Sequence, residues 1–182
     1  NMNLSPHFPS TAKIWLASWK KKTGEQLDGA IAADVVALGD VVQASGQQIP
    51  LPDGGSISGD QLAPFAIKGI YEKFPTGAQA AERKTYQEAI TTSAASILTQ
   101  APNPEAMAQA LGQGLSEDRI VVWSADPKVE QRLTDAGVGG SLSVEDGHNV
   151  QFVALNGSGS KLDAFLDRSL SYEVGRCVDD QG

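Results

Sequence analysis

The most regular pattern of hydrophobic and polar positions lies in residues 150–174. From Leu162 onward, apolar residues recur at every second position, which is the period of a long strand with one buried face. Residues 150–155 form a shorter apolar run, and Asn156-Gly157 between the two runs is typical of a tight turn. The pattern predicts an antiparallel hairpin that joins a sheet and gives the helices a surface on which to pack.

Apolar residues spaced three and four apart predict the helices of the chain. They fall at residues 10–23, 35–45, 58–74, 79–100, 104–115 and 127–136. In the first of these helices, Trp15 and Trp19 are four residues apart, on one stripe with Ala12 and Leu16. Such a stripe packs against other elements more often than it binds a ligand, so both tryptophans are expected in the core.

Polar residues mark where these helices begin. Candidate N-cap residues, whose side chains accept a hydrogen bond from a backbone N–H, are Ser10, Asp34, Asn103 and Asp126. Ser58 and Gln61 fit a capping box that opens the helix at residues 58–74. Pro64 falls in or near the first turns of this helix, where proline is tolerated, so the helix start is expected at or after Ser58.

The remaining apolar runs are short and predict strands. These strands are expected at residues 27–33, 48–51, 56–57, 119–124 and 142–144. The first is interpreted as a buried strand, and Pro52-Asp53-Gly54-Gly55 joins the second and third in a small hairpin. Strands and helices interleave irregularly, and the C-terminal pairing is antiparallel. The sequence therefore predicts an α/β or α+β fold, with helices packed on a mixed sheet.

The composition is that of one globular domain spanning residues 1–182. Hydrophobic residues make up 41% of the chain and charged residues 20%, so a sizeable core can form without disulfides. The formal net charge is −8 at pH 7. Nucleic acids and anionic membranes select clustered Lys and Arg, so an acidic chain is expected to bind neither. Lys20-Lys21-Lys22 stands at a predicted helix end, where cations interact favourably with the helix dipole.

Cys177 is the one cysteine of the chain. It allows no intrachain disulfide and no cysteine-based metal site. The sequence contains no recognisable signal peptide and no apolar run long enough to span a membrane. A single cysteine this close to residue 182 suggests a disulfide partner farther along a longer chain. We therefore expect the sequence to be a fragment of a longer protein.

Few residues are spaced for chemistry. His7 and His148 are far apart, and neither has a His, Cys or acidic pair at ligand spacing. Both are expected in solvated loops, and no metal site is predicted. The run from Asn156 to Lys161 is rich in glycine, as phosphate-binding loops are, but it lacks the Walker spacing and leads into a strand. A hairpin connection is therefore expected there.

Arg83 and Gln87 form a candidate anion-binding site. They are four residues apart in the helix at 79–100, so one helix face presents both side chains. A guanidinium group can hold a phosphate by two parallel hydrogen bonds. The alternative is that Glu82 and Arg83 are ordinary surface charges at the solvated start of a long helix.

Several sequence runs along the chain carry a family resemblance. They are DGAIAADVVALGDVVQASGQ, PDGGSISGDQL, IYEKF, ERKTYQ, VVWSADPKVEQ and LNGSGSKLDAFLDRSLSYEV. Together they resemble a family of unknown function that is found in surface proteins of high-GC Gram-positive bacteria. The resemblance covers nearly the whole chain and is most specific between Asn156 and Tyr172. It implies an extracytoplasmic domain at the cell surface, in a longer protein whose membrane anchor lies outside this sequence.

Residues 3–115 carry a second and more distant likeness. The matching features are, in order, Asn3-Leu4, Thr23-Gly24, Leu27-Asp28, Asp34, Ala44-Ser45-Gly46, Ser58-Gly59 and Arg83-x-x-Tyr86-Gln87. They resemble the later part of the LytR-CpsA-Psr domain, whose members are cell-wall ligases that move glycopolymers from a polyprenyl pyrophosphate carrier. This likeness implies a central sheet with helices on both faces.

The site residues of that family match only in part. Arg83 and Gln87 match its R-x-x-R-Q motif, but Tyr86 stands in place of the second arginine. Lys68 is the nearest counterpart of a further arginine pair in the preceding helix. The family's metal-binding aspartate and first phosphate-binding arginine would lie upstream of residue 1. Each missing arginine removes charge-assisted hydrogen bonds to a phosphate, worth roughly 1.5–3 kcal/mol apiece.

Three functions follow as hypotheses. The missing arginines favour a non-catalytic binding or structural module of the cell envelope, with a cell-wall polymer or polyprenyl phosphate as its partner. The alternative is a phosphotransferase acting on a polyprenyl-(pyro)phosphate-linked glycopolymer through Arg83, Gln87 and Lys68, with Mg²⁺ as its only expected cofactor. That enzyme would need an apolar groove between sheet and helices, which Trp15, Trp19 and Phe65 could line. A third hypothesis is an adhesion module that uses the strand at 162–174.

Overall fold

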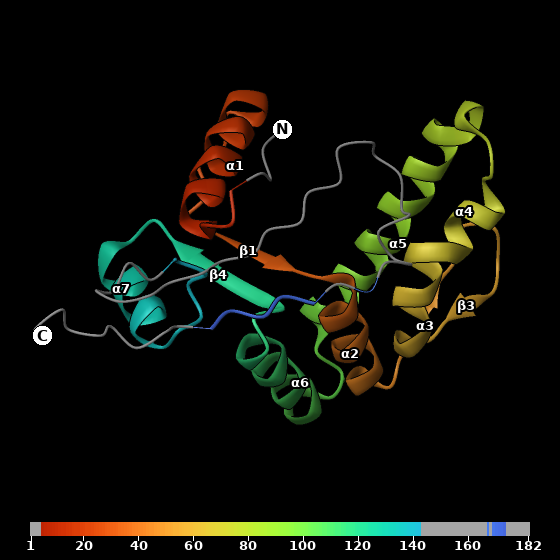
Figure 1. The fold of residues 1–182 in the computed structure, drawn as a ribbon. Coiled ribbons are helices and arrows are strands. Elements are labelled where there is room, and N and C mark those ends of the chain that lie inside the picture. The colour runs from red at the N-terminus through yellow and green to blue at the C-terminus, as the bar shows by residue number, and fades with distance from the viewer. Residues whose placement is uncertain (1–4, 143–166, 168, 174–182) are drawn as a thin grey trace, which may run out of the picture. The chain divides into compact units, whose positions relative to one another are not determined.

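The computed structural model describes residues 5–142, 167 and 169–173. The chain divides into two compact units, Asn1–Ser141 and Leu142–Gly182, and every helix and strand given below belongs to the first. Helices and short antiparallel strands make it an α+β fold (Figure 1). No helix within the described ranges is long and apolar enough to cross a membrane.

The elements follow the order expected from the sequence. They are α1 (Phe8–Thr23), β1 (Gly29–Ala33), α2 (Val35–Ser45), β2 (Ile49–Pro50), β3 (Ser56–Ile57), α3 (Gly59–Pro64), the π-helical turn η1 (Phe65–Gly69), α4 (Ile70–Lys73), the 3-10 turn η2 (Gly77–Gln79), α5 (Ala80–Gln100), α6 (Pro104–Ser116), β4 (Ile120–Ser124) and α7 (Pro127–Asp135). The predicted helices are confirmed to within one or two residues at most ends, and the predicted hairpin around residues 52–55 is present as β2 and β3.

Three of the predicted helix caps are present, whereas Asn103 stands before α6 without a capping hydrogen bond from its side chain. The Asp34 carboxylate accepts a hydrogen bond of 2.8 Å from the backbone N–H of Ala37, and Asp126 accepts from the two N–H groups that open α7. The capping box of Ser58 and Gln61 is also formed. The prediction that Ser10 caps α1 is wrong, because the helix begins at Phe8 with Pro9 in its first turn. Proline suits that position because its missing N–H would have no helical partner there.

The strands form two separate two-stranded sheets within the described ranges, rather than one mixed sheet. β1 and β4 pair antiparallel from Gly29↔Ser124 to Ala33↔Ile120. One face of this pair packs against α1 through a cluster of Phe8, Ala12 and Trp123. The expectation of a buried first strand is wrong, since Ile31 is 68% exposed. It lies on the face opposite α1, where neighbouring helices cover it incompletely.

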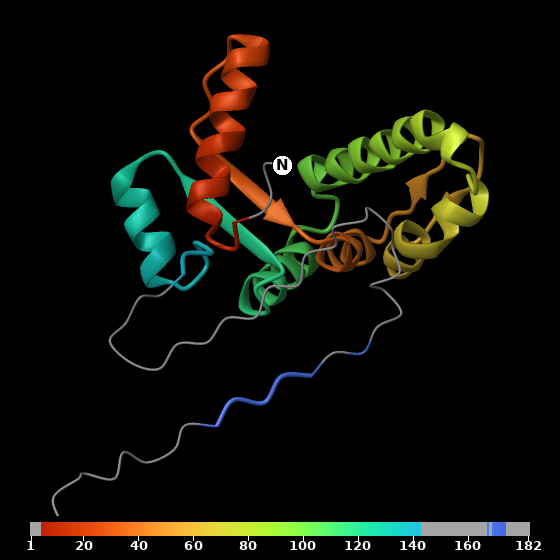
Figure 2. The same ribbon diagram turned by 45° about the horizontal axis from the view of Figure 1, so that its top comes forward.

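A larger core lies between α2, α3, α4 and α5, which lie side by side in Figures 1 and 2. Its buried side chains are Val42, Ile49, Ile57, Leu62, Ile70, Tyr86, Ile90, Ala94 and Ile97. α2 and α3 approach so closely that a Cβ added to Gly59 would stand 2.1 Å from the carbonyl oxygen of Gly39. Glycine at both positions therefore allows backbone-to-backbone contact between these helices.

The helix predicted at residues 58–74 is interrupted by a wider turn. It consists of α3, η1 and α4, with η1 starting directly after Pro64. Proline has no N–H for the carbonyl of Asp60, and its ring crowds that carbonyl. Directly after this proline the helix widens, and the N–H of Ile70 reaches back five residues to the carbonyl oxygen of Phe65. Sequence periodicity alone does not reveal this local change of helix type.

The two tryptophans of α1 differ in their surroundings. Trp15 is half-buried and packs edge-on against Phe8, with ring centroids 5.7 Å apart, as predicted. Trp19 is 44% exposed, so its predicted place in the core is wrong. The first turns of α1 carry the buried residues of the helix, and its last turns extend beyond the sheet (Figure 1).

The predicted C-terminal hairpin falls mostly outside the described residues. Residues 169–173 have no regular secondary structure, and Leu170 and Tyr172 are 59% and 53% exposed. The prediction that these two side chains lie on a buried strand face is therefore wrong. A period-two pattern permits an extended chain but does not supply the surface that would cover it. His148, Asn156–Lys161 and Cys177 also lie outside the described residues.

Candidate functional site

Two apolar cavities meet beside α2. The first, of about 260 Å³, is lined by Ala33, Val35, Leu38, Leu62, Phe65, Ala66, Ile70, Gln87, Ile90 and Thr91. The second, of about 340 Å³, is lined by Ile31, Ala33, Ala37, Leu38, Val41, Leu98, Ala101, Pro104, Met107, Ala108, Leu111 and Ile120. Ala33 and Leu38 belong to both walls, so the cavities adjoin. We refer to the two cavities together as the α2 groove.

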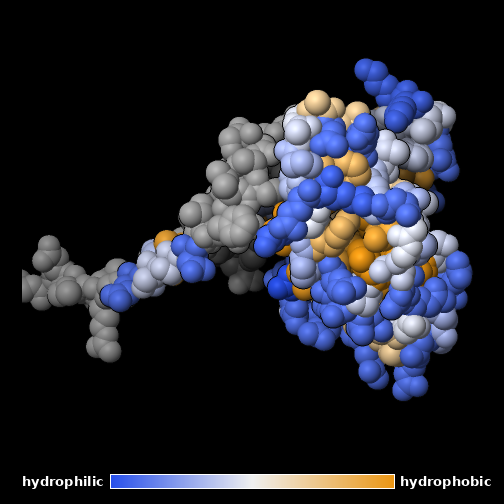
Figure 3. Space-filling view, turned by 90° about the vertical axis from the view of Figure 1, so that its right-hand side faces the viewer, coloured by the Kyte–Doolittle hydropathy of each residue, from blue (hydrophilic) through white to orange (hydrophobic). Residues whose placement is uncertain are grey.

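The groove follows from the residues that α2 and its neighbours present. Ala33, Ala37 and Ala66 are small, so they leave space between the larger apolar side chains around them. Gln87 and Thr91 supply the polar groups of the first cavity, both from α5. Each cavity is near the lower end of the volumes of ligand sites, roughly 300–1,000 Å³. Figure 3 shows apolar side chains gathered among hydrophilic ones on the side of the molecule that carries α4 and α5.

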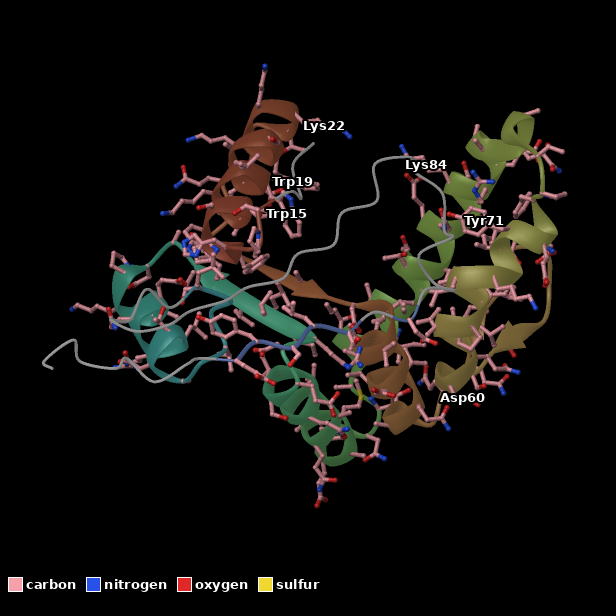
Figure 4. All side chains as sticks on the ribbon, in the orientation of Figure 1. Trp15, Trp19, Lys22, Asp60, Tyr71 and Lys84 are labelled. Atoms are coloured by element: carbon pink, nitrogen blue, oxygen red, sulfur yellow. The ribbon has the colours of Figure 1, made fainter. Side chains whose placement is uncertain are left out.

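The structure separates the roles of Arg83 and Gln87. Gln87 is half-buried in the wall of the first cavity. Arg83 is held elsewhere: its Nη1 donates a hydrogen bond of 3.1 Å to the carbonyl oxygen of Phe74. Its guanidinium carbon lies 4.7 Å from the ring centroid of Tyr71, a residue that Figure 4 labels on α4. Arg83 therefore fastens the start of α5 to α4.

Lys68, the third candidate, is a surface residue of η1. Its Nζ lies 3.6 Å from Glu72, and both side chains are 66% exposed. Within the described part of the chain, no hydrogen bond or ion pair joins Lys68 to Arg83 or Gln87. The three side chains predicted from the sequence are therefore not assembled into one anion site by direct contacts.

Tyr86, one residue before Gln87 on α5, takes part in a different network. Its hydroxyl donates a hydrogen bond of 2.5 Å to Asp53 Oδ1, and Lys73 forms an ion pair with Asp53 Oδ2. Burial, and then the bond to Asp53, raise the pKa of Tyr86 to about 12. The hydrogen bonds from Lys73 and then Tyr86 lower the pKa of Asp53. Sequence reasoning missed this network because no spacing rule relates a turn residue to side chains on two later helices.

A second polar network fixes the start of α2. Arg119 Nη1 lies 2.6 Å from Asp34 Oδ2, and Arg119 Nε lies 3.0 Å from Glu117 Oε2. The Asp34 carboxylate thus caps α2 and also binds the residue before β4. As for metals, the described residues contain no group of three His, Cys, Asp or Glu side chains arranged to hold an ion.

Comparison with known proteins gives one match. Residues 1–71, which include α1, β1, α2, the β2–β3 hairpin and α3, match the model of a family described as a protein of unknown function (DUF4012). No curated protein and no solved structure matches the chain. The resemblance beyond residue 71 and the likeness to the LytR-CpsA-Psr domain stay predictions. The chain is thus similar, over its first 71 residues, to a family of unknown function.

Proposed function

We propose that this chain is a non-catalytic binding module of the Gram-positive cell envelope. In this proposal it has a LytR-CpsA-Psr-like core, and its α2 groove holds the apolar chain of a polyprenyl phosphate. The single observation that carries the proposal is the adjoining of two apolar cavities along α2. A ligand that fills both must be elongated and apolar, which describes a prenyl chain better than a sugar polymer.

The polar end of the ligand would lie near Gln87. The Gln87 amide is among the few polar groups in the wall of the first cavity, beside Thr91. The neutral Gln87 amide can donate hydrogen bonds to a phosphate oxygen but adds no charge, and the Thr91 hydroxyl already donates to the backbone carbonyl oxygen of Gln87 at 2.9 Å. Affinity would then come mainly from burial of the prenyl chain, at about 25 cal/mol per Å² of apolar surface.

The state of the basic side chains favours binding over catalysis. Phosphoryl transfer depends on cations positioned around the transferring group. Arg83 is bonded to Phe74 and stacked on Tyr71, Lys68 is paired with Glu72, and Tyr86 is bonded to Asp53. Using Arg83 for a phosphate would require breaking its contacts to α4. A phosphotransferase therefore remains the less supported alternative.

The test is isothermal titration of the chain with farnesyl phosphate, a soluble short-chain analogue, with and without Mg²⁺. Ala33 lines both cavities and is itself exposed, so Ala33→Trp should obstruct the groove without disturbing the core. We expect it to weaken binding by at least about tenfold, or about 1.4 kcal/mol. The matched control is Ala95→Trp, at an exposed alanine of α5 outside both cavities, which should bind like the wild type.

Two outcomes would contradict the proposal. Equal binding by wild type and Ala33→Trp would remove the α2 groove as the site. Binding that requires Mg²⁺ and is lost in Arg83→Ala would instead favour the phosphotransferase. Circular dichroism of each variant checks that a loss of binding does not arise from unfolding.

A further inference from the structure

α1 is a basic helix in an acidic chain. It carries Lys13, Lys20, Lys21 and Lys22 and has no acidic residue, whereas the whole chain has a formal net charge of −8. All four lysines are exposed, and Lys13, Lys21 and Lys22 make no ion pair with any described residue. The positive charge of α1 is therefore available to a partner. The negative net charge of the whole chain does not reveal this local positive charge.

Apolar surface lies beside these lysines. Trp19, directly before Lys20, is 44% exposed, although α1 buries its first turns against the β1–β4 sheet. Figure 4 shows Trp15, Trp19 and Lys22 following one another along α1, with Trp15 nearest the sheet. The second half of the helix thus presents Trp19 and three lysines, Lys20, Lys21 and Lys22, on a part of α1 that extends beyond the sheet.

We propose that residues 19–22 at the end of α1 form a docking surface for a bilayer of anionic phospholipids. Tryptophan is favoured in the headgroup region because its ring is apolar and its indole N–H can still donate a hydrogen bond. Lysine side chains can lie along apolar surface while their ammonium groups reach the lipid phosphates. The lysines select an anionic lipid surface over a neutral one, and exposed Trp19 favours a bilayer interface over a soluble polyanion.

The contacts that Trp19 and Lys20 make within the chain are compatible with this role. Trp19 Nε1 donates to Glu25 Oε2 at 3.1 Å, and Lys20 Nζ donates to Gln26 Oε1 at 3.0 Å. Both acceptors are exposed residues of the short segment that follows α1, so lipid phosphates can replace them at little cost. Acidic side chains elsewhere in the chain repel the lipid phosphates only within about a Debye length, roughly 8–10 Å at moderate salt.

The test is co-sedimentation of the full chain with phosphatidylcholine vesicles that contain about 30% phosphatidylglycerol or none. We expect binding to the anionic vesicles alone, weakened by added salt and accompanied by a blue shift of tryptophan emission. The variant Lys20→Ser/Lys21→Ser/Lys22→Ser should lose at least about tenfold in affinity. Trp19→Ala should bind more weakly and lose most of the emission shift.

The matched control is Lys84→Ser/Lys128→Ser/Arg132→Ser, which removes the same charge from exposed positions on α5 and α7. Its binding should equal that of the wild type. Equal loss in both triple variants, or equal binding to neutral and anionic vesicles, would overturn the proposal. Binding of polyglutamate without binding of vesicles would also overturn it, in favour of an acidic protein partner. The vesicles contain no polyprenyl lipid, so these results do not depend on the α2 groove.

Discussion

The hydroxyl of Tyr86 donates a hydrogen bond of 2.5 Å to Asp53 Oδ1 and so ties the middle of α5 to the turn between β2 and β3. Lys73 at the end of α4 pairs with the other oxygen of the same carboxylate. An isolated hairpin with strands this short would be unstable in water. Tyr86 and Lys73 therefore hold this short hairpin against α5 and α4 through the single carboxylate of Asp53.

Tyr86→Phe removes one hydrogen bond and leaves the ring packed against Phe65 and Phe74. We expect the free energy of unfolding to fall by about 1–2 kcal/mol, because Asp53 then lacks one of its donors. Urea unfolding measures this change. The matched control is Tyr71→Phe, since the Tyr71 hydroxyl makes no hydrogen bond to any described residue. Similar losses for both variants would contradict a special role for Tyr86.

The raised pKa of Tyr86 predicts a loss of stability in alkali. The pKa is about 12 in the folded chain, against an ordinary value of 10.0. Between these values the unfolded chain releases the hydroxyl proton while the folded chain retains it. The stabilisation is thus fully present below pH 10 and is lost as the pH rises towards 12. The difference in unfolding free energy between wild type and Tyr86→Phe should shrink over this interval. A constant difference would show that the hydroxyl titrates normally.

The close contact of α2 and α3 predicts unequal responses to two glycine substitutions. A Cβ at Gly39 would stand 2.5 Å from the carbonyl oxygen of Gly59, so Gly39→Ala should destabilise the fold by about 1–3 kcal/mol. A Cβ added at Gly112 in α6 would meet no described atom within 4 Å, apart from its chain neighbours and the adjacent backbone of the same helix. Gly112→Ala should stabilise the fold by about 0.5–1 kcal/mol through helix propensity. Thermal unfolding compares the two variants. Equal changes in melting temperature would show that α2 and α3 can move apart without loss of stability.

We expect substitution of Arg83 to lower the stability of the fold rather than the affinity for a ligand. Arg83→Ala removes the hydrogen bond to Phe74 and the contact with the Tyr71 ring, and we expect it to cost about 1–2 kcal/mol. Its neighbour Lys84 lies 3.8 Å from Glu88 with both side chains exposed, so Lys84→Ala should cost less than about 0.5 kcal/mol. Chemical unfolding of Arg83→Ala and Lys84→Ala measures the difference in their free energies of unfolding. An Arg83→Ala variant as stable as Lys84→Ala would mean that its contacts to α4 contribute nothing.

The features that the sequence predicted best depend on neighbouring residues. The Asp34 cap and the Ser58–Gln61 capping box each involve residues within one turn of each other. Such local rules hold whatever the rest of the fold does. They were enough to predict the helices and the mixture of helix and strand.

The features that the sequence did not predict depend on distant partners. Trp19 has the spacing of a core residue, but whether it is buried depends on where the sheet ends beneath α1. Leu170 and Tyr172 alternate as in a strand, yet they are exposed. The same reason applies to the α2 groove, whose walls come from eight elements: β1, α2, α3, η1, α4, α5, α6 and β4. Only Gln87 of the three predicted site residues lies in that wall.

The pairing of β1 with β4 has a consequence for the kinetics of folding. Gly29 faces Ser124, and α2 to α6 lie between them in the sequence. Closing so long a loop costs chain entropy before any contact between the two strands forms. Proteins with many contacts between residues distant in sequence therefore fold slowly. We therefore expect the helices between the two strands to assemble first and the sheet to close late. Substitutions in β4 should then accelerate unfolding far more than they retard refolding.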